Sequence, residues 1–205
     1  MTYKLSPQSF VKYNVADTCS IWNILSSIVL YRAATSKASN CYFCCTQFVC
    51  YECLIRTRNN QSDTEAELKR RLIEERERGN QFVDYSINIE DLQDMEALEN
   101  RKRLGKGELS SIILAKKTRQ AFITDDKKAR NLAEKVLDAN MVQTTPHLFG
   151  WLLYSNILND SDKTTVIKEH SKFRTTNWGN LTIFFEKMYM KALEYKLMDN
   201  TPKVS

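Results

Sequence analysis

Histidine is scarce in this chain, with only His147 and His170 among 205 residues. A zinc hydrolase built on histidine ligands, or an enzyme with a histidine general base, is therefore poorly supplied. The sequence also lacks an apolar stretch near the roughly 20 residues that span a bilayer, and its first residues lack the apolar core of a signal peptide. We therefore expect a cytoplasmic protein that has no membrane partner.

Internal repeats and low-complexity segments are also absent. With 42% hydrophobic residues, a chain of this length can form one well-cored domain, whereas two full domains would be crowded. The net charge of +5 is modest, and the basic clusters lie among many acids. This balance permits a nucleic-acid partner but does not by itself require one.

Five of the six cysteines fall between residues 41 and 53. Cys41-x-x-Cys44 followed by Cys50-x-x-Cys53 has the paired spacing of a zinc site, because two such thiolates can share a tetrahedral ion. The gap between the pairs is only five residues, however, and no glycine or proline is present to form tight knuckles. We favour a buried strand that runs into a helix, with cysteine acting as a small apolar residue. Zinc is therefore not expected.

Short apolar runs alternate with helical patterns along the chain. Strands are predicted at about residues 12–16, 41–46, 82–87, 121–124 and 141–143. Helices are predicted at about residues 18–30, 47–58, 64–78, 89–102, 108–118, 128–137, 148–157 and 181–197. Thr18 or Ser20 is expected to cap the first helix, and Thr46 the second. Strands that alternate with helices indicate an α/β fold with a parallel central sheet.

Several acidic residues lie where such a fold binds ligands. Asp17 and the pair Asp125-Asp126 follow predicted strands. In an open parallel sheet, ligands bind outside the carboxyl ends of the strands, so we expect these acids to share one cleft. Oxygen ligands of this kind, without histidine, favour Mg²⁺ or Mn²⁺.

Each acid also has a simpler structural explanation. An aspartate after a strand often only caps a helix, which would account for Asp17, Asp125 and Asp126. Glu108 near a helix start complements the helix dipole. Glu52 differs, because apolar residues surround it in the sequence and a buried carboxylate there would need a partner or a metal ion.

Four short segments carry these acids. Residues 15–20 read Val-Ala-Asp-Thr-Cys-Ser, residues 46–52 Thr-Gln-Phe-Val-Cys-Tyr-Glu, residues 105–109 Gly-Lys-Gly-Glu-Leu and residues 124–130 Thr-Asp-Asp-Lys-Lys-Ala-Arg. In order and character they resemble the PIN-domain nucleases, in particular the toxin and ribonuclease branch with a Gly-x-Gly-Glu helix start and a Thr-Asp-Asp-x-x-Ala-Arg turn. The resemblance extends over residues 13–172 and is strongest from 105 to 130.

The resemblance implies a three-layer α/β/α fold and hydrolysis of phosphodiester bonds in RNA, with one or two Mg²⁺ or Mn²⁺ ions activating water. It implies that the catalytic acids are Asp17, Glu52, Glu108 and Asp126. The metal ligands would be these four and Asp125, and the choice between Asp125 and Asp126 as principal ligand stays open. Phosphate contacts, or simply a solvated surface, are expected of four basic residues: Lys106, Lys127, Lys128 and Arg130.

The resemblance also implies a division of the chain. Residues 1–172 would form the nuclease domain, with a charged helical segment at 62–79, and residues 173–205 would form a C-terminal helical extension. Such a protein could be the toxin of a toxin–antitoxin or defence system, with RNA as its substrate and a protein inhibitor or a second copy of the chain as its partner. The alternative class is a non-catalytic zinc-binding or protein-interaction module on a degenerate PIN fold.

Overall fold

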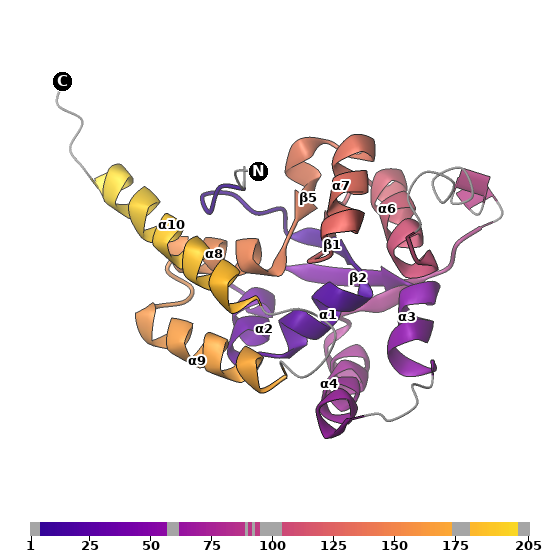
Figure 1. Ribbon diagram of the computed structural model, residues 1–205, viewed down its shortest axis with the longest axis horizontal. Helices are drawn as coiled ribbons and strands as arrows, with labels where there is room; N and C mark the ends of the chain where they lie inside the picture. Colours follow the sequence, from indigo (N-terminus) through magenta and orange to yellow (C-terminus); the bar gives the residue numbers. More distant parts are fainter. Residues whose placement is uncertain are drawn as a thin grey trace.

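A five-stranded parallel sheet runs through the centre of the protein in the computed structural model (Figure 1). The structure describes residues 5–56, 62–88, 90–91, 93–94, 104–173 and 181–200. All neighbouring strands are parallel, in the order β3-β2-β1-β4-β5. The strands are β1 (Tyr13–Ala16), β2 (Tyr42–Thr46), β3 (Val83–Tyr85), β4 (Ala121–Ile123) and β5 (Val142–Gln143). The prediction of an α/β fold with a parallel central sheet is confirmed.

Helices cover both faces of the sheet, which gives three layers (Figure 1). Strand side chains alternate between the faces, so that Val15 and Phe122 pack in one hydrophobic cluster and Ala16 and Ile123 in the other. The first cluster includes residues of α6 (Lys106–Thr118) and α7 (Lys127–Val136). The second includes residues of α1 (Thr18–Leu25), α2 (Ile28–Thr35), α3 (Gln47–Leu54), α4 (Asp63–Gly79), α8 (Thr145–Tyr154), α9 (Asp160–Lys172) and α10 (Thr182–Asn200). A short 3-10 helix (Ala139–Met141) precedes β5.

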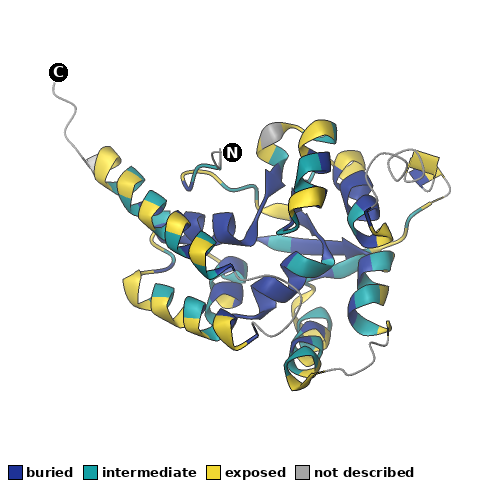
Figure 2. Cartoon of the chain, viewed as in Figure 1, coloured by how far each residue is buried: buried dark blue, intermediate teal, exposed yellow. Residues whose placement is uncertain are grey.

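The strand β2 determines how the cysteines pack, and Figure 2 shows that this central part of the sheet is buried. Cys41, just before β2, lies in the same hydrophobic cluster as Cys45 and Cys53, whereas Cys44 lies in the cluster on the opposite face. The thiol of Cys44 donates to the backbone oxygen of Asn14 at 3.6 Å. Because Cys41 and Cys44 point to opposite faces of the sheet, they cannot share one ion. These cysteines pack as buried apolar residues.

The first helical segment differs from the prediction. Instead of one helix, the chain forms α1 and α2, because the hydroxyl of Ser27 accepts a hydrogen bond from the backbone N–H of Leu30 at 3.1 Å and starts a second helix. The cap of α1 is Asp17, not Thr18 or Ser20. The predicted cap of α3, Thr46, is confirmed.

The C-terminal helix α10 packs against α8, where the rings of Phe149 and Phe185 lie 5.2 Å apart. The preceding helix α9 is not predicted from the sequence. Residues 174–180 and 201–205, and most of the helix predicted at 89–102, lie outside the described residues, so the domain boundary near residue 173 stays a prediction. Among the described helices, none combines the length and the apolar content needed to cross a membrane.

The two histidines are buried, and we expect them to make stability depend on pH. Burial lowers the pKa of His147 and of His170 to about 4. As the pH falls from 6.5 towards 4, the unfolded chain binds protons that the folded chain does not bind. Each histidine therefore lowers the free energy of unfolding by about 1.4 kcal/mol for each pH unit in this window, and its contribution is fully present above it.

Chemical denaturation between about pH 7.5 and 5 tests this expectation. Buried carboxylates such as Asp17 act in the opposite direction, so wild type must be compared with the double variant His147→Gln/His170→Gln, which cannot titrate at these positions. The double variant should lose less stability on acidification than wild type. Equal pH dependence in the two proteins would contradict the prediction.

Candidate active site

The sheet brings two strand ends together at the point where the strand order reverses. β1 and β4 are neighbours, with β2 and β3 on one side and β5 on the other. Open parallel sheets bind ligands outside the carboxyl ends of the strands at such a position. Asp17 follows β1, Asp125 and Asp126 follow β4, and the backbone N–H of Asp17 donates to the carbonyl oxygen of Ile123 at 3.4 Å. Asp17 and Asp126 therefore lie at the same edge of the sheet.

Asp17 is buried and surrounded by hydrogen-bond donors. One carboxylate oxygen accepts from the backbone N–H of Ser20 at 2.9 Å and from its hydroxyl at 2.7 Å, which caps α1. The thiol of Cys19 donates to the same oxygen at 3.1 Å, and the hydroxyl of Thr124 donates to the other. Burial raises the pKa of Asp17 to about 6, although these donors favour the charged form. The carboxylate is thus held in one orientation, and nearby positive charge would favour its ionisation.

The two aspartates after β4 have different partners. Asp125 accepts from the side-chain amide of Asn23 on α1 at 2.8 Å, and from the backbone N–H and the hydroxyl of Thr145 on α8 at 2.9 and 2.6 Å. Through these hydrogen bonds, the carboxylate of Asp125 connects the end of β4 to α1 and α8. Asp126 caps α7, where its Oδ1 accepts two backbone N–H groups at 2.6 and 2.8 Å. Of the two residues, Asp126 is therefore the better placed to meet a ligand, as Asp125 is committed to the fold.

Glu52 and Glu108 meet at the start of α6. The hydroxyl of Thr18 donates to Oε2 of Glu52 at 2.6 Å. Burial raises the pKa of Glu108, and the nearby carboxylates of Glu52 and Asp126 raise it further. Oε2 of Glu108 is buried and has no hydrogen-bond partner in the part of the chain that the structure describes. An unpaired oxygen in an acidic cluster suits a cation.

Two glycines make room for these carboxylates. A Cβ atom at Gly107 would lie 2.7 Å from Oε2 of Glu52, and a Cβ atom at Gly105 would lie 2.5 Å from Oε2 of Glu108. Both distances are too short for a carbon and an oxygen that are not bonded. The Gly-Lys-Gly-Glu segment is therefore needed for both acids to approach the backbone at the start of α6.

The four predicted catalytic acids are thus linked to one another in pairs. Thr124 links two of them, because its hydroxyl donates to Asp17 and accepts from the backbone N–H of Asp126 at 3.1 Å. Glu108 is linked to the others by charge, since the carboxylates of Glu52 and Asp126 both raise its pKa. Within the described residues, however, no group of three His, Cys, Asp or Glu side chains is placed to hold a metal ion. Carboxylates without a cation between them repel one another, and the oxygens of Asp17 face protein donors. The acids are neighbours but do not form a preassembled set of ligands.

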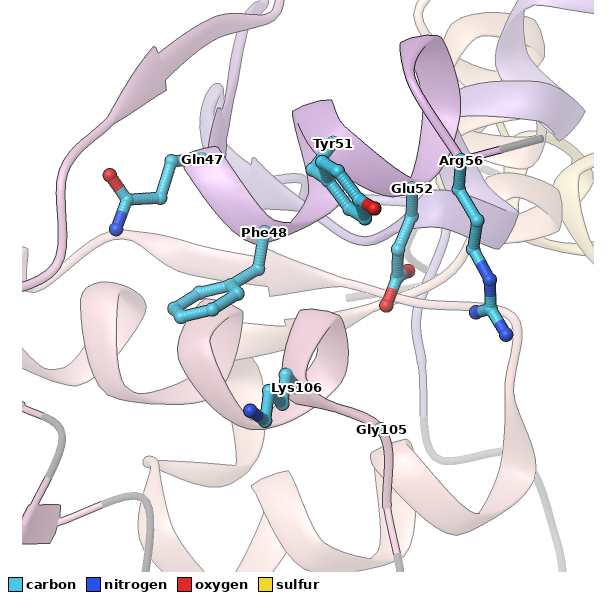
Figure 3. Close-up of a pocket in the computed structure, with 7 residues that line it drawn as sticks. All are labelled: Gln47, Phe48, Tyr51, Glu52, Arg56, Gly105 and Lys106. Atoms are coloured by element: carbon cyan, nitrogen blue, oxygen red, sulfur yellow. The ribbon is translucent and has the colours of Figure 1, made fainter.

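A pocket of about 560 Å³ lies beside Glu52, between α3 and α6 (Figure 3). Glu52 lines it from α3, and Lys106 lines it from the start of α6. One predicted phosphate-binding residue therefore lines the same pocket as one predicted catalytic acid. The pocket extends the candidate active site away from the sheet.

A comparison with known protein families agrees with this architecture. Residues 44–137 match the family model DUF3368, whose description is PIN domain. The expected resemblance to the PIN-domain family is confirmed over this segment. The matched segment contains Glu52, Glu108 and both aspartates after β4, whereas Asp17 precedes it. No curated protein and no solved structure matches the chain.

PIN domains are generally nucleases, so the family points to a nuclease-type function at this site. The parallel sheet between two helical layers is consistent with a PIN-like α/β/α fold. The other predicted phosphate contacts lie on α7, where Lys127 and Lys128 are exposed in the first turn. Arg130 lies one turn further, and its charge partly offsets the burial that raises the pKa of Asp125.

The side chains that position these acids were not predicted from the sequence. Thr18 holds Glu52, Thr124 holds Asp17, and Asn23 and Thr145 hold Asp125. The sequence contains a hint for Asn23, because this polar residue interrupts an apolar stretch of α1 and would need a hydrogen-bond partner if buried. The threonines carry no such hint, since a hydroxyl beside an acid is equally common in caps and turns.

Proposed function

We propose that this protein is a PIN-type, metal-dependent endoribonuclease that hydrolyses phosphodiester bonds in single-stranded or structured RNA. The observation that supports this most strongly is the gathering of Asp17, Glu52, Glu108 and Asp126 at one edge of the sheet, where the charges of three carboxylates act on one another. Ionised carboxylates this close together need positive charge nearby at neutral pH. A divalent cation would supply it.

Mg²⁺ or Mn²⁺ is the proposed cofactor. The donor set consists of carboxylate oxygens without histidine, which suits hard cations, and the unpartnered Oε2 of Glu108 within the described residues fits such an ion. Glu52, Glu108 and Asp126 would hold the cation, and Asp17 completes the proposed ligand set. Asp125 would instead support the site, because its oxygens accept hydrogen bonds from Asn23 and Thr145. When bound, a divalent ion lowers the pKa of a water molecule that acts as nucleophile and offsets the charge of the scissile phosphate.

The remaining roles belong to the protein's own groups. Ser20 and Thr124 hold Asp17 in one orientation, and Thr18 does the same for Glu52. Holding the acids in advance lowers the reorganisation needed when the substrate arrives. Contacts to phosphates beside the scissile bond are assigned to four basic residues: Lys106, Lys127, Lys128 and Arg130.

We extend the proposal to the biological role of a toxin in a toxin–antitoxin or defence system, with a protein inhibitor or a second copy of the chain as partner. The resemblance of residues 105–109 and 124–130 to that branch of the family supports this role. The alternative of a non-catalytic zinc-binding module has less support, because Cys41 and Cys44 lie on opposite faces of the sheet.

Removal of metal tests the proposed activity. Wild-type protein and labelled RNA, both unpaired and hairpin-forming, are incubated with Mg²⁺, with Mn²⁺ or with EDTA. We expect cleavage with either ion, none in EDTA, and recovery when excess Mn²⁺ is added back. Because an ion that binds only the folded state stabilises it, Mn²⁺ should also raise the Tm. Cleavage that persists in EDTA, or a protein that shows neither cleavage nor a Mn²⁺-dependent Tm, would contradict the proposal.

A further inference from the structure

Residues of α3 form one wall of the pocket between α3 and α6. Residues four apart lie on the same face of an α-helix. Phe48 and Glu52 follow this spacing on α3, and Arg56 continues it just beyond the end of the helix. Figure 3 shows their side chains extending from this wall into the pocket, with Lys106 below Phe48 at the start of α6. These four residues give the pocket an aromatic ring, a carboxylate and two cations.

Tyr51 forms the second aromatic part of this wall. It lines the pocket beside Phe48, and 52% of its surface is exposed to solvent. An exposed tyrosine alone carries no meaning, since Tyr13 is 55% exposed at the opposite end of the sheet. The setting of Tyr51 is different, because its ring adjoins a concave site that contains the predicted catalytic acid Glu52. A flat apolar ring held at the wall of a pocket offers a surface on which another flat ring can stack.

The cations give the pocket a second chemical character. Arg56 and Lys106 approach it from opposite sides of Glu52, and both are exposed. Guanidinium and ammonium groups next to aromatic rings form the usual combination in proteins that bind single-stranded nucleic acid, where rings stack on bases and cations contact the backbone. The volume of about 560 Å³ lies in the range of small-ligand sites and is ample for one nucleotide.

We propose that this pocket is a nucleobase subsite that receives an unpaired base of the RNA next to the scissile phosphate. Tyr51 stacks on the base with Phe48 beside it, and Arg56 and Lys106 contact the adjoining phosphates. The inference rests on the proposed ribonuclease activity, because Glu52 belongs both to the pocket and to the acid cluster. A base in a duplex is stacked and paired and cannot enter such a pocket, so the subsite favours single-stranded segments.

Binding measurements separate stacking from charge. The probes are a fluorescently labelled ten-nucleotide single-stranded RNA and an oligomer of equal length and charge whose sugars carry no bases. Fluorescence anisotropy in Ca²⁺, with the RNA checked for intactness, gives Kd for wild type and the variants. Tyr51→Ala should weaken binding of the RNA about tenfold or more and leave binding of the base-free oligomer unchanged. Tyr51→Phe keeps the ring and should bind as wild type does.

Two further variants serve as controls. Arg56→Gln should weaken binding of both oligomers equally, and the loss should shrink as the salt concentration rises, because its contact is to phosphate. Tyr13→Ala removes an equally exposed tyrosine far from the pocket and should bind both oligomers as wild type does. Unchanged RNA binding by Tyr51→Ala, or equal loss with both oligomers, would overturn the subsite.

The outcomes also distinguish the subsite from the activity. If wild type cleaves RNA but Tyr51→Ala binds it normally, the subsite is wrong and the ribonuclease stands. If wild type cleaves no RNA yet Tyr51→Ala loses binding only to the base-containing oligomer, the subsite stands and the catalytic proposal fails. Wild-type protein that binds neither oligomer would overturn the subsite.

Discussion

Replacement of Asp17 by asparagine is expected to lower metal-dependent RNA cleavage by roughly a hundredfold or more while the protein still folds. The change removes one negative charge from the acid cluster and keeps the shape of the side chain. Asparagine caps helices as well as aspartate does, and its amide can satisfy Ser20 and Thr124 after the hydroxyl of Thr124 turns. The variant should therefore fold as wild type does but lose most of its cleavage activity.

The stability of the Asp17→Asn variant provides a second readout. Because burial raises the pKa of Asp17 to about 6, the ionised side chain destabilises the folded state at pH 7.5 when no cation is present. A neutral asparagine avoids that cost, so the Tm of the variant without metal should equal or exceed that of wild type. Mn²⁺ should raise the Tm of wild type more than that of the variant.

Two variants complete the comparison with Asp17→Asn. Asp17→Ala removes the cap and leaves the hydroxyls of Ser20 and Thr124 without their acceptor, so it should be about 2 to 3 kcal/mol less stable than Asp17→Asn, which is also neutral. Glu77→Gln removes one negative charge from an exposed position of α4, and its RNA cleavage should match that of wild type. Wild-type cleavage by Asp17→Asn would show that a different site, or a contaminating nuclease, cuts the RNA.

The sequence predicts those features that depend on local patterns. The apolar run before Asp17 and the short run at residues 121–124 give the two central strands, and each strand ends at an acid. Thr46 caps α3 as predicted, because a cap needs only the N–H groups of the next turn. Together these elements predict that Asp17 and Asp126 lie at one edge of the sheet.

Features that depend on residues far apart in the sequence cannot be predicted from such local patterns. Asp125 and Asp126 are adjacent and chemically equal in the sequence, and only the positions of Asn23 and Thr145, brought close by folding, commit Asp125 to the scaffold. The helix α9 is missed for a related reason. Few of its residues are apolar, and its stability depends on packing against α2 and α10. Tertiary contacts decide both cases.

Replacement of Gly107 by alanine is expected to lower RNA cleavage about ten- to a hundredfold without touching any acid. The new Cβ atom would lie 2.7 Å from Oε2 of Glu52, so the carboxylate must move and its 2.6 Å hydrogen bond from Thr18 must weaken. Stability should change little, because alanine favours the helix by up to about 1 kcal/mol and the displaced group is the end of a flexible side chain. Activity and stability should again separate.

The Gly107→Ala prediction can be checked against two other glycines. Gly105→Ala places a Cβ atom 2.5 Å from Oε2 of Glu108 and should impair cleavage in the same way, through the second acid. Gly79→Ala, at the end of α4 and away from the cluster, should leave cleavage unchanged. If Gly107→Ala cleaves RNA as wild type does while Glu52→Gln is inactive, the position of the Glu52 carboxylate seen here is not the one used in catalysis. If Gly105→Ala and Gly107→Ala both cleave as well as Gly79→Ala does, the close approach of the acids to the start of α6 has no part in the reaction. The carboxylates would then move to other positions when they bind the metal ion.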